Sequence, residues 1–343
     1  MANSNSSSPV DRLIKGGAQA ANREAKGRYL GELANRDRAS GILNPGEVSG
    51  EYNSARLLST TLGGQLRALT HDDLQTFRNN VKKLGKKFKG GITAKGVIDL
   101  STHIDRERSN QEIRTAIPMQ SIAGRIHFIT NAGPNSDVTR HHVHIEMLNY
   151  NAAISSPGKL ADLAKILIAG PLKFDCDCGR HTFWFRHIAT VGNFNAGRPE
   201  TGFPKIRNPG LIGVACKHVL RVMNQLSMPI TRMQIEKMIN RGRNSLDGKV
   251  QRLTKKEAED IAKKQADQAH WKRSQVETSG EKKDRLLRAK SAQAYSAKLL
   301  QRAALKKNAA IARQALAKDV KGLETKQALT PKQVAAILKI LEQ

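Results

Sequence analysis

The sequence predicts an α+β fold, in which a small body containing a β-hairpin and a cysteine-rich module carries extended helical N- and C-terminal arms. Three observations predict it. Helical patterns and two β-rich runs occur together between residues 56 and 242. All three cysteines of the chain fall in one stretch, residues 174–223. After residue 243 the chain is rich in Lys, Arg, Ala, Gln and Glu, which are strong helix formers.

The 343 residues leave room for two or three domains. We expect a polar flexible arm over 1–55, an α+β body over 56–242, a long basic helical arm over 243–325 and a C-terminal docking helix over 326–343. The first arm has too few apolar residues to bury a core. The basic arm is expected as one or two long helices with a break near ETSGEKK, residues 277–283. Its thin apolar stripe should pack on another domain or chain.

Each element of the first half of the body has a local reason. Thr70 can cap a helix over residues 71–84, because apolar residues follow it at helical spacing and acidic residues occupy its first turn. The β-rich runs 121–130 and 138–150 are joined by the turn-forming sequence NAGPNSD, which predicts a β-hairpin. Residues 158–169 have the pattern of a short amphipathic helix.

The second half of the body starts with the aromatic and β-branched segment His181–Val191, which we expect to be a strand. An irregular loop with four glycines and three prolines follows. A helix then covers residues 215–226, and Thr231 with Gln234 is interpreted as the capping box of the next helix. The same pattern at Thr330 opens the C-terminal helix.

The net charge of +28 indicates a polyanionic partner, with nucleic acid the first expectation and an acidic protein surface the second. Two groups of cations are the candidate nucleic-acid contacts, one at the end of the first helix and one around the cysteine module: Lys82, Lys83, Lys86, Lys87, Arg180, Arg186, Lys205 and Arg207. The lysines can equally be a solvated helix end that suits the helix dipole. The aromatic run 183–185 can be core or a platform for stacked bases.

The cysteines form the pattern C-x-C, a long gap, then C-x-H. The candidate metal ligands are Cys176, Cys178, Cys216 and His218. Three thiolates and one imidazole complete a tetrahedral shell for Zn²⁺ and leave no open position, which predicts a structural site. Two alternatives stay open: the cysteines can be buried thiols without a metal, and His181 or His187 can replace a ligand.

A second candidate site lies on the second strand of the expected hairpin, where His142, His144 and Glu146 share one face. These side chains can bind a metal, even a catalytic one, or simply form a polar strand face. Other carboxylates are too scattered to indicate a nuclease: Asp99, Asp105 and Glu107. Since the sequence has no P-loop, no G-x-S-x-G and no H-E-x-x-H, we expect a protein that is not an enzyme.

The C-x-C and C-x-H pairs resemble the SWIM-type zinc finger, whose pattern has the same order of ligand types. The resemblance covers roughly 45 of the residues, and the gap of 37 residues between Cys178 and Cys216 is longer than is usual in that family. It implies a short β-hairpin followed by a helix, and binding to nucleic acid or protein. The runs 140–153, 176–186 and 202–223 resemble uncharacterised proteins of tailed bacteriophages, several of them treated as virion components.

Two hypotheses follow from charge, metal pattern and resemblance. The first is a structural component of a bacteriophage virion that contacts packaged DNA and neighbouring head, neck or tail subunits, forms homo-oligomers, and resides in the host cytoplasm before assembly. The second is a SWIM-finger nucleic-acid-binding accessory protein that acts in the infected cell. The polar N-terminus and the lack of a run of about 18 apolar residues predict no signal peptide and no membrane span.

Overall fold

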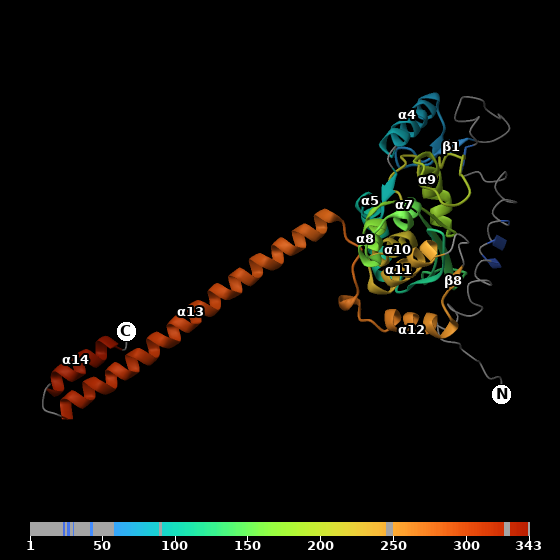
Figure 1. Cartoon of the computed structure of the whole chain (residues 1–343). Coiled ribbons are helices and arrows are strands. Elements are labelled where there is room, and N and C mark those ends of the chain that lie inside the picture. The colour runs from blue at the N-terminus through green and yellow to red at the C-terminus, as the bar shows by residue number, and fades with distance from the viewer. Residues whose placement is uncertain are drawn as a thin grey trace, which may run out of the picture. The chain divides into compact units, whose positions relative to one another are not determined.

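The structure is a computed structural model that describes residues 58–88, 91–244, 250–325 and 330–341, together with seven residues of the N-terminal part: 23, 24, 26, 27, 30, 42 and 43. Most of the polar arm expected over 1–55 therefore lies outside the described residues. The chain divides into two compact units, residues 1–278 and 279–343. The described elements are helices and strands in one chain, which confirms the α+β class (Figure 1).

The centre of the first unit is an antiparallel sheet with the strand order β3-β7-β6-β5-β4-β8. Its strands are β3 (Ile92–Thr93), β4 (Ala116–Ile122), β5 (Arg125–Asn131), β6 (Arg140–Met147), β7 (Pro171–Cys176) and β8 (Gln251–Arg252). A separate two-stranded ribbon consists of β1 (Ser59–Thr60) and β2 (Arg67–Ala68). The predicted hairpin is confirmed as β5 and β6, with Phe128 opposite Val143 and His127 opposite His144.

Strand β4 extends this hairpin into a meander that the sequence did not predict. The turn between β4 and β5 contains Ala123 and Gly124, both in the left-handed region at φ 43° and φ 80°. A Cβ atom at Gly124 would lie 2.6 Å from Cβ of Tyr150, so the turn requires glycine for space as well as conformation. The Ala-Gly pair is a weaker turn signal than NAGPNSD. The sequence therefore predicted one strand over residues 121–130, where the structure has the end of β4, a turn and β5.

Helices cover both faces of the sheet. The helices α10 (Lys217–Gln225) and α11 (Pro229–Asn244) pack on one face, and four more helices pack against them: α5 (Ala94–Asp99), α6 (His103–Glu112), α7 (Tyr150–Ser155) and α8 (Leu160–Ala169). On the other face α12 (Lys255–Ala266) packs Ala258 and Ala262 against Ile117, Met119 and Ile129. The main core lies on the α10 side, where the strands present Val143, Ile145 and Phe174.

Several predicted helices are confirmed, two of them with the caps that the sequence indicated. Thr70 caps α4 (His71–Lys87) through a capping box with Asp73, and Leu74 and Phe77 are buried. The helices expected over 158–169 and 215–226 are α8 and α10. In the second unit, Thr330 accepts a hydrogen bond from the backbone of Gln333 and opens α14 (Pro331–Leu341). These caps depend on residues three apart, which the sequence displays directly.

Two local predictions were wrong. The strand expected over His181–Val191 is a π-helical turn, η1 (His181–Phe185), followed by α9 (Arg186–Val191). The buried residues Phe185, Ile188 and Ala189 have the spacing of a helix, so burial on one helical face outweighs the β-propensity of the segment. Thr231 is not a cap, because α11 begins two residues earlier at Pro229, which suits a first helical turn.

The basic helical arm begins at Ser279, not at residue 243. Strand β8 pairs with β4, α12 packs on the sheet, and the 3₁₀ turn η2 (His270–Lys272) also belongs to the first unit. In the second unit, α13 (Ser279–Thr325) is one helix of 47 residues, and α14 packs against it with Val320 and Val334 buried. The composition of the chain predicted that the arm starts at residue 243, which is too early. Residues 255–266 have the composition of an exposed helix, because small alanines, and not large apolar residues, pack α12 against the sheet.

Among the described residues, no helix is both long and apolar enough to cross a lipid bilayer.

Candidate metal centre

The four predicted ligands converge on one point. Cys176 ends β7, Cys178 follows it, Cys216 is the N-cap of α10, and His218 lies in the first turn of that helix. One donor atom of each lies within 4.8 Å of the others, and Sγ of Cys176 is 4.0 Å from Nδ1 of His218. Zinc bond lengths imply separations of about 3.8 Å between sulfurs in a tetrahedral shell, so the group fits a four-coordinate ion. The four residues could therefore hold a metal ion.

The ligand group is buried, with side chains at most 5% exposed. Burial raises the pKa of Cys176 and of Cys216, and a thiolate at Cys178 adds to the effect. At Cys178 burial acts in the same direction, but hydrogen bonds from the other two thiols and the charge of His218 outweigh it and lower the pKa. Burial also lowers the pKa of His218. Because a metal requires deprotonated thiolates and a neutral imidazole, binding of a cation to this group would release protons from the thiols.

The two rival ligands lie outside this group. Nε2 of His181 is 3.1 Å from a carboxylate oxygen of Asp175, and Nδ1 of His187 is 3.2 Å from the carbonyl oxygen of Glu200. The backbone N–H of His181 nevertheless contributes, because it donates to Sγ of Cys178 at 3.3 Å. A hydrogen bond of this kind favours the thiolate that a metal requires.

Asp177, which lies between the first two cysteines, connects the loop that carries them to strand β6. Its Oδ1 accepts a hydrogen bond from the backbone N–H of His142 at 3.1 Å and lies 3.0 Å from Nδ1 of His141. The ring of His141 packs against the ring of His218, with centroids 4.3 Å apart. The sequence pattern did not indicate His141 as part of this site. The strand pattern offered a signal for it, because His141 shares the face of Val143, which lies opposite Cys176.

The second candidate site forms a different arrangement on the α12 side of the sheet. His142 and His144 lie there as predicted, but Glu146 forms an ion pair with Arg125 at 3.3 Å. Their neighbour is His127, which the sequence did not indicate: its Nε2 is 3.0 Å from Nδ1 of His142 and its ring stacks on His144. Burial lowers the pKa of His127 and of His144, which favours the neutral form of these two rings. Within the described ranges the Cys₃His group is the one metal-ligand cluster.

The candidate nucleic-acid residues separate into an exposed group and a buried group. Lys82, Lys83, Lys86 and Lys87 are exposed on α4. Arg180 pairs with Asp105 at 2.6 Å and, with Arg207, lies over the Trp184 ring. Arg186 binds Asp175 at 3.1 Å and is 3% exposed, and Lys205 is 1% exposed. These last two side chains are not available to a ligand at the surface, because the fold has enclosed them.

Comparisons of the chain with protein families, with curated proteins and with solved structures find no match.

Proposed function

We propose that this chain is a non-enzymatic, zinc-stabilised structural protein of a tailed-bacteriophage particle that binds nucleic acid through its basic helix α13. The observation that carries the proposal is the charge of that helix. From residue 285 to residue 318 it contains no acidic residue and nine basic ones: Arg285, Arg288, Lys290, Lys298, Arg302, Lys306, Lys307, Arg313 and Lys318. A helix of 47 residues is about 70 Å long, which suits contact with an extended polyanion.

Zinc is the metal that the donor set favours. Three thiolates and one imidazole are soft and borderline ligands, typical of structural zinc. Since all four ligands come from the chain, no position remains for a substrate or an activated water, which supports a structural role. Elemental analysis of the purified protein should give one zinc per chain. Cobalt substitution should give the visible absorption of tetrahedral thiolate coordination, and its absence would contradict the assignment.

The binding test uses salt dependence. Fluorescence anisotropy with duplex DNA should show an affinity that falls linearly on a log–log plot against salt concentration. Four glutamine substitutions on α13, at Lys298, Arg302, Lys306 and Lys307, should reduce the slope by up to about four. The matched variant carries glutamine at Lys82, Lys83, Lys86 and Lys87 on α4, and it reports whether that patch also contacts phosphate. A wild-type chain that binds no DNA at low salt would contradict the proposal.

The virion setting is supported by the apolar side chains that α13 leaves exposed. Among them, Leu286, Leu300 and Leu305 are 47%, 72% and 68% exposed. Apolar surface of this extent on a helix is typical of a surface that another chain or domain covers, which supports a place in an assembly. Mass spectrometry of purified, dissociated particles should recover peptides of this protein. Absence from the particles, with DNA binding retained, would favour the alternative of an accessory protein in the infected cell.

A further inference from the structure

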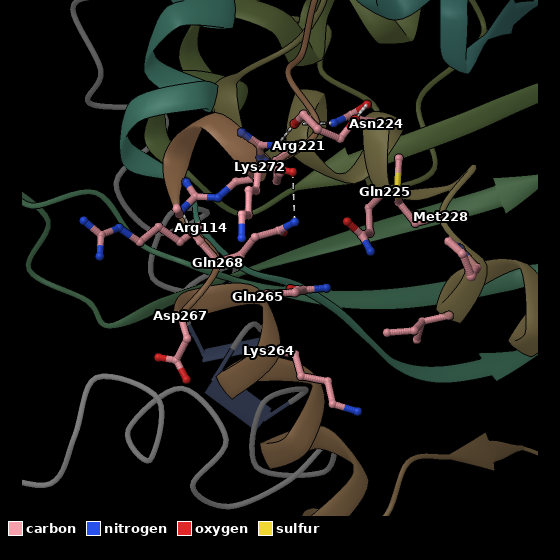
Figure 2. A pocket seen from close by; sticks show the side chains of 15 residues that line it. Arg114, Arg221, Asn224, Gln225, Met228, Lys264, Gln265, Asp267, Gln268 and Lys272 are labelled. Carbon is pink, nitrogen blue, oxygen red and sulfur yellow. Dashed lines mark hydrogen bonds between the residues drawn. The ribbon is translucent and has the colours of Figure 1, made fainter.

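The first unit contains a second basic site, and no residue of helix α13 belongs to it. A pocket of about 770 Å³ opens between the α10–α11 junction, the C-terminal end of α12 and residues 269–274. Its volume is within the range of small-molecule sites, about 300–1,000 Å³. Figure 2 shows Arg114, Arg221 and Lys272 on one side of the pocket and Gln225 and Met228 on the other.

The lining residues carry five cations and one carboxylate. The cations are Arg114, Arg221, Lys264, Lys272 and Arg273, and the carboxylate is Asp267. In the part of the chain that the structure describes, no carboxylate lies at ion-pair distance from Arg114, Arg221 or Arg273. Burial, and then the charge of a neighbouring arginine, lower the pKa of two of them: the neighbour is Arg273 for Arg221, and Arg114 for Arg273. Their mutual repulsion is a cost that a bound anion would relieve.

Arg221 is the buried element of the site. It is 3% exposed, and its guanidinium donates to the carbonyl oxygens of Ser274 and Ser109, both at 2.8 Å. Its Nε is buried without a hydrogen-bond partner among the described residues, and the same is true of Nε of Arg273. Desolvation, and then the charge of Arg273, lower the pKa of Arg221 to about 10. A buried guanidinium with an unsatisfied Nε–H carries a desolvation cost that a hydrogen-bond acceptor would offset.

Side-chain hydrogen bonds join the segments that line the pocket to one another and to the sheet. Asn224 donates to the carbonyl oxygen of Ser274 at 3.0 Å and accepts from its hydroxyl at 3.2 Å. The side chain of Asn110 exchanges two hydrogen bonds with the backbone of Val276. On the sheet side, Gln265 forms a similar pair with the backbone of Ala116. Segments that are connected in this way need less ordering when a ligand binds.

We propose that this pocket binds a phosphate ester of nucleotide size, with the phosphate on the arginines and the organic group against Met228 and Ile230. Guanidinium groups match the geometry of phosphate oxygens through paired N–H donors. The amide and apolar side chains opposite the arginines suit a sugar and a base. The phosphate can come from a free nucleotide or from the terminal phosphate of a nucleic-acid strand.

The test is isothermal titration calorimetry of the full, metal-loaded chain. The probes are ADP, adenosine, and a tetranucleotide with and without a 5′-phosphate. We expect one phosphorylated probe to bind with a stoichiometry of one, and adenosine and the unphosphorylated tetranucleotide to bind much more weakly. Preference for ADP identifies a free nucleotide, and preference for the phosphorylated tetranucleotide identifies a strand end.

The variants concern exposed cations, so that the fold is retained. Arg114→Gln with Lys264→Gln should weaken binding at least about tenfold, as expected for the loss of two charge-assisted contacts. Lys95→Gln with Lys159→Gln makes the same charge change outside the pocket and should leave affinity unchanged. Equal weakening of binding by both pairs of substitutions, or no binding of any phosphate ester, would refute the proposal that this pocket binds phosphate. Duplex DNA binding through α13 is measured separately, so either proposal can fail alone.

Discussion

Removing the metal should destabilise the first unit by an amount that the chain geometry predicts. The ion would join β7 to the start of α10 and close a loop of 37 residues between Cys178 and Cys216. The chain-entropy estimate for a cross-link of that length is about 4 kcal/mol. This is a large share of the roughly 5–15 kcal/mol by which a typical protein is stable. For a unit of this size, the loss corresponds to a fall in melting temperature of about 8–16 °C.

The assay is thermal unfolding followed by circular dichroism, with metal content measured on the same samples. The chelated protein and the Cys216→Ser variant should both melt lower than the untreated chain, and the chelator should have no further effect on the variant. His218→Asn should lose the metal, whereas His181→Asn, the same substitution at a buried histidine outside the ligand group, should retain it. An unchanged melting temperature after verified removal of the metal would refute the reasoning.

Two further predictions concern pH and backbone conformation. Burial lowers the pKa of His187 to about 4 from 6.5, so the unfolded chain binds its proton first, and about 3 kcal/mol of stability is lost as pH falls from 6.5 toward 4. The slope of the unfolding free energy against pH reports how many protons the unfolded chain binds in excess. His187→Asn should lower this number by up to one in that window, and an unchanged slope would contradict the assignment. Gly124→Ala should cost about 2 kcal/mol in urea unfolding, whereas Gly85→Ala in α4, which meets nothing closer than 4.0 Å, should be neutral or stabilising.

Local chemistry decided which parts of the structure the sequence could predict. The caps at Thr70 and Thr330 were visible because both partners lie three residues apart. The Cys₃His group was visible because few arrangements other than a metal site bring three cysteines and a histidine together at C-x-C and C-x-H spacing. Neither prediction needed knowledge of how distant segments pack.

The missed features depend on tertiary register. His127 joins His142 and His144 only because β5 and β6 pair with one particular offset. The helix over residues 181–191 forms because Phe185 and Ile188 bury one face against the core, whereas propensity alone favoured a strand. Contacts between segments outweigh differences in propensity, which amount to about 1 kcal/mol or less per residue.

Helix α10 connects the metal centre to the pocket, and this connection determines which variants are informative. Its first turn carries His218, and Arg221 lies less than one turn further along, with Asn224 on the same helix. Loss of the metal would release the start of α10 and displace the buried arginine, so Cys216→Ser should weaken phosphate binding without touching the pocket. That result would not identify the binding residues. The exposed pair Arg114 and Lys264 lies on other segments, and its substitution leaves the ion in place, so retained metal with lost phosphate affinity would assign the site.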